Sequence, residues 1–425
     1  MDMSGRDPEK DETRSGLNAP APGTSSDDVL VVTGEASGDC YASQVVKAAL
    51  AAAGPGRTVR FFGSGGDALR ACGVDLLTDI HELSAIGPIE AFKLAGNYFR
   101  LFSGILREVK RRRTRVALLV DFPDFNLPLS GFLRRRGVQV LYYISPTVWA
   151  WRPGRIRVIR RNVSRLMCIF PFEEKLYRDR GVEVEYVGHP LLSTVSDIEP
   201  RDDFRRRYAL PEGACLVSVL PGSRRKEVQH ILPILLEALE RIRAEMPDTL
   251  FVIPAASATV RAEIQGVISR WFDSGPRHLR EEDLRVIDGD ATNCLANSHA
   301  GIVKSGTSTL QAAVAGTPFI MVYRTTLPTW VLGQIILRNK YFCIVNLIAD
   351  REIVPEILQK RLTGETTARA FLDVVRSESR YRKMKGELEE IRDTLGSRRA
   401  PESVAARLLE ALGREPAASE GERNA

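Results

Sequence analysis

Short apolar runs alternate with longer amphipathic stretches along most of this chain, and this alternation restricts the possible folds more than any other feature. Several runs are apolar at consecutive positions, which is typical of strands that helices cover on both faces. The alternation predicts parallel sheets with crossover helices. The predicted strands are Val29–Val32, Val59–Phe62, Val116–Val120, Val138–Ile144, Leu166–Phe170, Val184–Val187, Cys215–Leu220, Leu250–Ile253, Arg285–Ile287, Gly301–Val303 and Phe319–Tyr323.

The length of the chain indicates two such units, because 425 residues exceed what one hydrophobic core usually organises. A charged stretch, Ser193–Arg207, separates the strands of the two halves. We therefore predict an α/β protein with two Rossmann-like, doubly wound domains that face a central cleft. The predicted divisions are a disordered extension at 1–28, a first domain at 29–195, a second domain at 196–370, C-terminal helices at 371–413 and a disordered tail at 414–425.

The charge of the chain suits an anionic partner. The net charge is +6, and residues 1–28 hold seven of the 54 acidic side chains but three of the 60 basic ones, so the remainder is more basic still. Phosphorylated metabolites, nucleic acid and an anionic membrane are all suitable partners for a basic protein of this kind. No RRM, KH or zinc-finger signature accompanies the charge, so a non-catalytic nucleotide or nucleic-acid binder is the weaker alternative.

The cysteines and the apolar runs indicate the cellular compartment of the protein. The six cysteines are scattered without a C-x-x-C pair or a close Cys/His set, which argues against a zinc site and favours reduced thiols. No apolar run reaches the length of about 18 residues that spans a bilayer, and the N-terminus does not resemble a signal peptide. We expect a cytoplasmic protein, either free or on a membrane surface.

Two acids stand at the exits of predicted strands, where open α/β sheets bind their ligands. Glu35 lies between the glycines of the segment Gly34–Asp39, either as a site residue or in a solvated loop. Asp121 directly follows a buried strand, either as a site carboxylate or as a helix cap. For Asp39 and Asp124, capping of a helix is the stronger interpretation.

Two helix starts in the second half favour an anion. The segment Pro221–Glu227 turns through Gly222 and Ser223 into a helix and offers Arg224 for a bidentate phosphate contact, without Walker A spacing. Lys304–Gln311 is a second candidate, a strand end that turns through Gly306 and hydroxyl side chains into an apolar helix. Together they suit a diphosphate such as that of a nucleotide sugar, although ordinary capping explains either one alone.

Three further segments are ambiguous. Ser145–Arg152 holds two tryptophans beside an arginine, which form either a wall for a sugar or acyl group or part of a core. Gly63–Ala68 satisfies G-x-G-x-x-A, but it follows the second strand and lacks a ribose-binding acid. His189, alone after a strand, is better explained as structural.

These segments together resemble the lipid-A-disaccharide synthases in kind and order, over about residues 29–360. The resemblance implies a GT-B glycosyltransferase that joins UDP-2,3-diacylglucosamine to 2,3-diacylglucosamine 1-phosphate, giving a β(1→6) disaccharide and UDP with no required metal or other cofactor. The segments that carry it are Gly34–Asp39, Asp121–Asn126, Ser145–Arg152, Leu220–Arg224 with Glu227, Ser305–Thr307 and Asn346–Ala349.

The resemblance also implies roles for single residues. Asp121 matches the family's essential aspartate, and Glu35 matches an acid of its N-terminal loop. The first domain would take the acceptor and the second the UDP-sugar. The implied substrate-binding residues are Gly222, Ser223, Arg224, Ser305, Gly306, Thr307, Gln311 and Asn346.

The chain departs from the family pattern at several positions. Gln311 stands where the family usually has the Glu that holds the ribose hydroxyls, so the side chain keeps its hydrogen bonding but not the charge. Val345 replaces a common Pro and Asp350 a common Gly, and Gly63–Ala68 keeps part of a glycine-rich string. Another GT-B enzyme that acts on a UDP-sugar, either an N-acetylglucosaminyltransferase or an epimerase, is the alternative function.

The acylated substrates of that family imply an apolar surface near a membrane. Ile86–Arg113 combines apolar residues with a basic end, as a helix at the inner face of the cytoplasmic membrane would. An ordinary core helix with a basic end fits the same sequence. We predict peripheral membrane association and no nucleic-acid partner.

Overall fold

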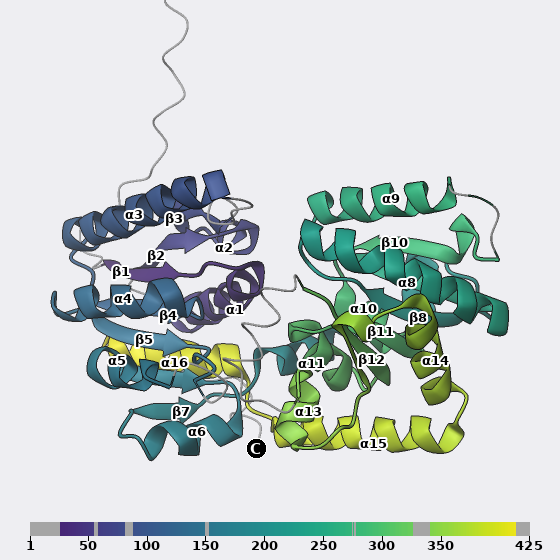
Figure 1. Cartoon of the computed structure of the whole chain (residues 1–425). Coiled ribbons are helices and arrows are strands. Elements are labelled where there is room, and N and C mark those ends of the chain that lie inside the picture. The colour runs from purple at the N-terminus through teal and green to yellow at the C-terminus, as the bar shows by residue number, and fades with distance from the viewer. Residues whose placement is uncertain are drawn as a thin grey trace, which may run out of the picture.

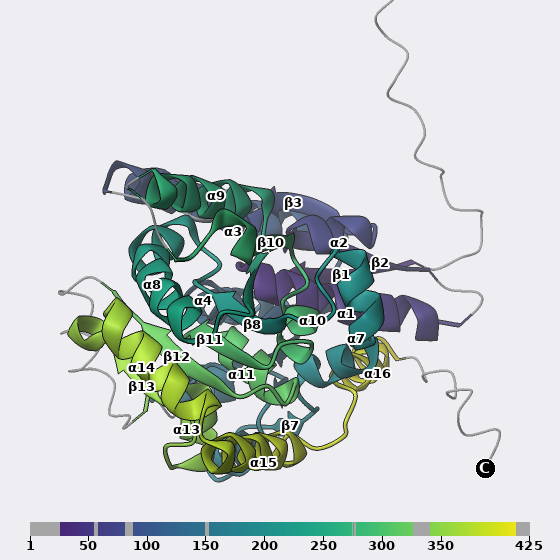
Figure 2. The same cartoon turned by 90° about the vertical axis from the view of Figure 1, so that its right-hand side faces the viewer.

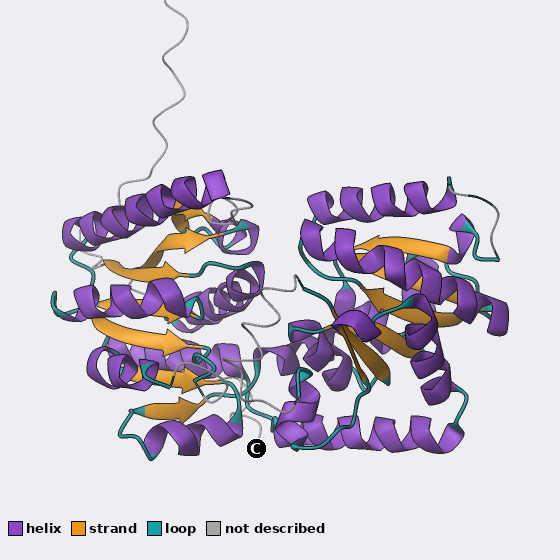
Figure 3. Cartoon of the chain, in the orientation of Figure 1, coloured by secondary structure: helices purple, strands orange, loops and turns teal. Residues whose placement is uncertain are grey.

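The computed structural model describes residues 26–54, 58–80, 88–148, 153–273, 275, 278–325 and 341–413. Two α/β lobes lie side by side, each with a central parallel sheet between helices (Figures 1 and 3). The predicted fold class is confirmed.

The first lobe contains a seven-stranded parallel sheet in the order β3-β2-β1-β4-β5-β6-β7. Its strands are β1 Ser26–Val32, β2 Thr58–Gly65, β3 Asp75–Asp79, β4 Val116–Val120, β5 Gln139–Tyr143, β6 Arg165–Cys168 and β7 Val184–Tyr186. Its helices are α1 Ala36–Ala52, α2 Asp67–Ala71, α3 Pro88–Arg111, α4 Pro123–Arg134, α5 Arg155–Asn162 and α6 Pro171–Arg178.

The second lobe contains a six-stranded parallel sheet in the order β10-β9-β8-β11-β12-β13. Its strands are β8 Cys215–Leu220, β9 Thr249–Ala255, β10 Leu284–Asp288, β11 Ala300–Lys304, β12 Phe319–Tyr323 and β13 Glu356–Leu358. Along the rest of the chain, the longer helices are α8 Arg225–Glu245, α9 Ala258–Phe272, α14 Gly364–Val375, α15 Glu378–Thr394 and α16 Ala400–Ala411. The shorter ones are η2 Pro190–Asp197, α7 Arg201–Arg207, η3 Glu281–Asp283, α10 Ala291–Ala296, α11 Thr307–Val314, α13 Ile344–Ala349 and η4 Gln359–Arg361.

The two sheets share one topology. In each, the chain builds strands outward in one direction, returns to the centre and continues in the other, so the order reverses between β1 and β4 and again between β8 and β11. Loops at the carboxyl ends of strands on either side of such a reversal diverge and leave room for a ligand. This topology selects the loops after β1, β4, β8 and β11 as the places for a site.

The core explains why the strand sequences are apolar at consecutive positions. Val29 and Val31 pack on one face of the first sheet and Leu30 and Val32 on the other, and all four are fully buried. Helices cover both faces, so neither set of side chains can be polar. The apolar runs named from the sequence all overlap strands, whereas β3 and β13 were not predicted.

Two boundaries differ from the predicted divisions. The strand β1 begins at Ser26, inside the predicted extension, because Asp27 and Asp28 form ion pairs with Arg115 and Arg60 of the same lobe. The rest of the extension and the tail from 414 lie outside the described residues. The charged stretch before the second lobe is partly helical, and Phe204 of α7 is fully buried in that lobe's core.

The last helix returns to the first lobe. After α15 the chain crosses back, and α16 packs against α1, as the yellow helix in Figures 1 and 2 shows. Arg407 of α16 forms hydrogen bonds of 2.8 and 3.0 Å with the carboxylate of Glu185 in β7. The C-terminal helices therefore do not form a separate unit, because α16 completes the first lobe.

Candidate functional site

The predicted site residues lie at the four selected loops, except Gln311 on α11 and Asn346 on α13. Glu35 follows β1, Asp121 follows β4, Arg224 follows β8, and Ser305–Thr307 follow β11. The carboxyl ends of neighbouring parallel strands meet at one sheet edge, so each lobe presents two of these loops together.

Asp121 has an unusual backbone conformation that several hydrogen bonds hold in place. Asp121 and Phe122 both have left-handed backbones, with φ of 47° and 51°. The N–H of Asp121 donates to the carbonyl of Tyr143 at 2.9 Å, and its carbonyl accepts from the Tyr142 hydroxyl at 2.6 Å and the Asn126 amide at 2.8 Å. Non-glycine residues in this region are strained, and such strain concentrates at functional sites.

Phe122 connects the loop after β4 to the loop after β1. Its ring lies against Gly34, where a Cβ atom would come within 2.5 Å of the ring. Only glycine therefore fits at position 34, and this contact places Glu35 beside Asp121. Two separate sequence motifs form one surface at the edge of the first sheet.

The environment of Asp121 makes its carboxylate a stronger base than an ordinary aspartate. Burial raises its pKa to about 6, the negative charge of Glu35 adds to the increase, and a hydrogen bond from the Phe122 N–H opposes it. A carboxylate with a pKa near 6 is mostly ionised at neutral pH and accepts a proton more readily than one near 4. The site therefore contains a candidate general base.

Glu35 also links the two lobes. Its Oε1 lies 3.2 Å from Nη2 of Arg224, and the two side chains remain 55% and 66% exposed. Exposed ion pairs contribute little stability. The importance of this pair is its position, since it shows that the carboxyl ends of β1 and β8 meet.

The turn after β8 is held by an internal carboxylate. Gly222 has φ of 136°, and a Cβ atom there would lie 2.5 Å from Oε2 of Glu227. Glu227 accepts from the Ser223 N–H at 3.1 Å and from Nζ of Lys304 at 2.8 Å. Gly222 and Ser223 therefore shape the turn, whereas the exposed side chain of Arg224 is available to an anion. Lys304, the last residue of β11, begins the second candidate segment of the sequence, but this contact with Glu227 was not predicted.

The second helix start presents a different set of groups. Gly306 and Thr307 are exposed at the beginning of α11, and Gln311 lies about one turn further along the helix, half-buried. No side-chain cap hydrogen bond forms at the described start of α11. Ser305 donates its hydroxyl to the carbonyl of Phe342 at 3.2 Å. The exposed helix start suits an anion through its N–H groups and dipole.

Asn346 does not have the geometry of a direct substrate contact. Its Oδ1 accepts from the N–H groups of Ile353 and Val354 at 2.8 and 2.9 Å. Its Nδ2 donates to the Val354 carbonyl at 2.8 Å and to Glu356 at 2.9 Å. These bonds use the full capacity of the amide, and the residue is fully buried. The implied binding role of Asn346 is therefore corrected to one of holding the segment after α13.

Two other polar residues have structural roles. Asp39 is buried and accepts from the N–H groups of Gly66, Ala68 and Leu69 at 2.7, 2.9 and 3.3 Å. It therefore occupies the helix start at which a dinucleotide motif would bind phosphate. Burial lowers the pKa of His189 to about 3, and its Nδ1 accepts from the Leu191 N–H. His189 is therefore neutral.

The structure describes only part of the two remaining candidate segments, Ser145–Arg152 and Ile86–Arg113. Trp149, Trp151 and Arg152 lie outside the described residues, as do 86 and 87 and the side chains of 88–95. In the described part of α3, Leu101 and Ile105 are buried against the first sheet, while Phe99 is 73% exposed.

The described residues contain neither a membrane-spanning helix nor a cluster of metal ligands. Among the helices of those residues, none is both apolar enough and long enough to cross a membrane. The same residues contain no group of three His, Cys, Asp or Glu side chains placed to hold a metal ion.

Comparison with known sequences gives matches over nearly the whole chain. A family model described as Lipid-A-disaccharide synthetase matches residues 29–408. A lipid-A-disaccharide synthase of Koribacter versatilis (strain Ellin345) is 38% identical over 379 residues, which cover 89% of this chain and 96% of that protein. The same enzyme of Myxococcus xanthus (strain DK1622) is 39% identical over 384 residues, covering 90% of this chain and 97% of that protein.

Solved structures share the two-lobed architecture. A putative UDP-N-acetylglucosamine 2-epimerase from Listeria monocytogenes matches with a TM-score of 0.61 and 12% identity, covering 92% of this chain and 97% of that one. The UDP-GlcNAc 2-epimerase from Neisseria meningitidis, bound to UDP-GlcNAc, matches with a TM-score of 0.61 and 11% identity, covering 90% of this chain and 100% of that one. At such low identity these matches establish the fold alone.

Proposed function

Because the chain belongs to the lipid-A-disaccharide synthetase family, we propose that it joins UDP-2,3-diacylglucosamine to 2,3-diacylglucosamine 1-phosphate and releases UDP. The chain is a glycosyltransferase that forms the lipid A disaccharide, and its fold is of the GT-B type, as the sequence predicted. The particular acylated sugars and the roles of single residues are the finer part of the proposal.

The observation that carries the residue roles is the meeting of Glu35 and Arg224 beside Asp121. It brings the acidic edge of the first lobe to the basic edge of the second. The first domain, 29–195, would take the acceptor hydroxyl, and the second, 196–370, would take UDP. A base and a diphosphate-binding group on opposite sides suit an inverting displacement.

In the proposed reaction, the acceptor hydroxyl attacks the anomeric carbon of the donor from the face opposite UDP. The new bond joins that oxygen to the carbon, and the bond from the carbon to the diphosphate oxygen breaks. Asp121 takes the hydroxyl proton. Because its pKa near 6 lies far below that of an alcohol, the proton moves late, as charge develops at the reacting carbon.

The leaving diphosphate would be stabilised by Arg224 and by the N-termini of α8 and α11. Fixed positive charge and helix N–H groups lower the barrier when they face developing negative charge. A diphosphate also competes with Glu35 for Arg224, since it carries more negative charge. Loss of that partner would leave the charge of Glu35 uncompensated and would strengthen Asp121 as a base.

We also propose that the protein works at the inner face of the cytoplasmic membrane, where acylated substrates reside. The support is the exposed ring of Phe99 on α3 beside the exposed Arg100 and Arg107 of the same helix, a combination that suits an anionic interface. Flotation with anionic liposomes tests this idea. Association that salt reduces is expected, and no association at low salt would contradict the proposal.

The experiment that tests the function is UDP release from UDP-2,3-diacylglucosamine, with and without the monosaccharide 1-phosphate. We expect release that depends on the acceptor and little release from unacylated UDP-GlcNAc. Epimerisation of UDP-GlcNAc, or equal use of the unacylated donor, would favour the alternative GT-B activities. UDP release at the same rate with and without the acceptor would contradict glycosyl transfer.

A further inference from the structure

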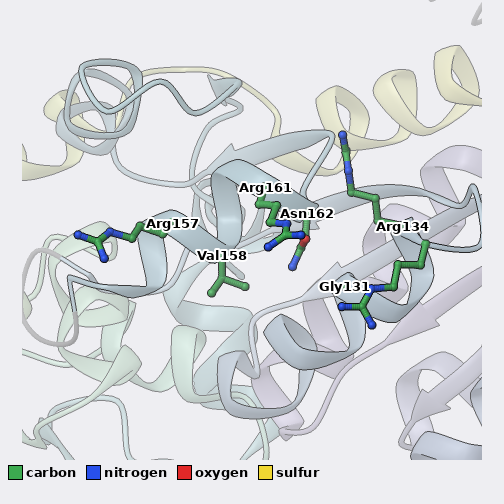
Figure 4. A pocket seen from close by; sticks show the side chains of 7 residues that line it. Gly131, Arg134, Arg157, Val158, Arg161 and Asn162 are labelled. Carbon is green, nitrogen blue, oxygen red and sulfur yellow. The ribbon is translucent and has the colours of Figure 1, made fainter.

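A pocket of 520 Å³ lies between α4 and α5 on the first lobe (Figure 4). Arginines dominate its lining, and none of the lining residues is acidic. These arginines are Arg134 and Arg135 from the end of α4 and Arg157 and Arg161 from α5.

The sequence spacing places these charges together. Arg157 and Arg161 are four residues apart and share one face of α5, and Arg134 lies on the face of α4 that also carries Gly131. A Cβ atom at Gly131 would lie 3.2 Å from Nδ2 of Asn162, so glycine lets the two helices approach closely. In Figure 4 the side chains of Arg134, Arg161 and Asn162 extend into the space between the helices.

The four arginines have no acidic partner in the part of the chain that the structure describes. Other arginines nearby do have one, since Arg155 of α5 pairs with Asp124 and Arg165 of β6 with Glu185. Like charges that converge repel one another, so a cluster without carboxylates is stabilised by a bound anion. Guanidinium groups match phosphate oxygens in geometry as well as charge.

The pocket lies away from the proposed catalytic edge. The helix α4 starts next to Asp121, and Arg134 is its last residue. The ten residues from Asp124 to Arg134 correspond to about 15 Å along the helix axis. A phosphate in the pocket would therefore not be the diphosphate that leaves during transfer.

We propose that this pocket is a second anion site, which binds a phosphate group. The phosphate belongs either to a phospholipid headgroup or to a soluble phosphate, and both offer the same chemistry to the arginines. Val158, which is 37% exposed at the pocket, gives the ester portion of such a ligand an apolar contact. The proposal stands on the pocket alone and does not depend on the transferase mechanism.

The test compares two double variants with equal loss of charge. Arg134→Ala with Arg161→Ala removes one arginine of the pocket from each helix. Arg136→Ala with Arg160→Ala is the control, because Arg160 lies on α5 and Arg136 lies two residues past the end of α4, and both are exposed and outside the lining. Unchanged melting temperature and unchanged UDP release in both variants show that the lobe still folds, and Arg157→Ala serves as a second pocket variant.

Two probes distinguish the source of the phosphate. Inorganic phosphate is titrated by calorimetry at low salt with UDP present to fill the nucleotide site, and vesicles of phosphatidylcholine with phosphatidylglycerol are tested by flotation. We expect the pocket variant to lose about tenfold in affinity for at least one probe, equivalent to one charged hydrogen bond, and the control to lose much less. Loss for phosphate indicates a soluble ligand, and loss confined to vesicles indicates a headgroup. Equal behaviour of the two double variants with both probes would overturn the proposal.

Discussion

At the scale of single residues, the chemistry depends on the loop after β4. Asp121 and Phe122 adopt a left-handed conformation that ordinary residues avoid. The Asp121 carbonyl accepts from the Tyr142 hydroxyl and the Asp121 N–H donates to the Tyr143 carbonyl, and these hydrogen bonds maintain the conformation. The same loop places the Phe122 ring over Gly34 and so brings Glu35 close. The proposed base is therefore positioned by contacts between residues that are distant in sequence.

The raised pKa of Asp121 predicts the pH dependence of catalysis. In the proposed mechanism the ionised carboxylate is the active form, so kcat/KM should fall as the pH drops through about 6. Glu35→Gln removes a negative charge that raises this pKa, so the midpoint of the acid limb should move to lower pH. A pH–rate profile of both enzymes measures the shift.

Asp124→Asn is the control for this prediction, since Asp124 lies in the first turn of α4, three residues after Asp121, but is not among the causes of the raised pKa. Its profile should keep the midpoint of the parent enzyme. A midpoint that does not move in Glu35→Gln, or that moves to higher pH, would show that Glu35 does not act on Asp121 through charge.

At the scale of helices and strands, burial on both faces made the strands predictable. Runs such as Val116–Val120 are apolar throughout because both sides of β4 are covered. The edge strand β3 was not predicted because it is short and has an acidic residue at each end, Asp75 and Asp79. The strand β13 was not predicted because it has only three residues, one of them Glu356. Edge and short strands carry weak patterns.

Hydrogen bonding between elements could not be predicted in the same way. The sequence does not indicate that Glu227 accepts a hydrogen bond from the Ser223 N–H. It also does not indicate that the Asn346 amide forms its hydrogen bonds with the segment at 353–356. Both depend on how distant segments pack. The residues that the structure does bring together, Asp121, Glu35 and Arg224, are those that directly follow strands at the topological reversals.

The corrected role of Asn346 gives a prediction at this scale. Asn346→Ala would leave two buried N–H groups and a carbonyl without their partner, so the free energy of unfolding should fall by about 2–4 kcal/mol. UDP affinity of the folded protein should change little. Denaturant unfolding and UDP titration measure the two effects.

Gln311→Ala is the matched comparison, because Gln311 is half-buried on α11 beside the exposed helix start. It should weaken UDP binding and leave the free energy of unfolding nearly unchanged. The opposite pattern, with UDP affinity lost in Asn346→Ala and kept in Gln311→Ala, would restore a direct binding role for Asn346.

At the scale of the whole molecule, two sheets of one topology present their divergent loops to each other. The chain also crosses between the lobes twice, through η2 and α7 and again after α15, and α16 packs on α1. The amphipathic pattern of α16 predicts a helix but not its partner, because that contact joins residues hundreds of positions apart. In the proposed function, this arrangement lets one lobe hold UDP while the other aligns the acceptor.

The division of labour between the lobes is tested most directly by comparing Asp121→Asn with Arg224→Ala, measuring turnover and UDP affinity for each. Asparagine tolerates the left-handed backbone, so the loop should persist. We predict that Asp121→Asn lowers kcat by roughly 10²- to 10⁴-fold with UDP affinity intact, the usual contribution of a general base. Arg224→Ala should weaken UDP binding itself. Undiminished turnover in Asp121→Asn, or UDP affinity untouched in Arg224→Ala, would contradict the account.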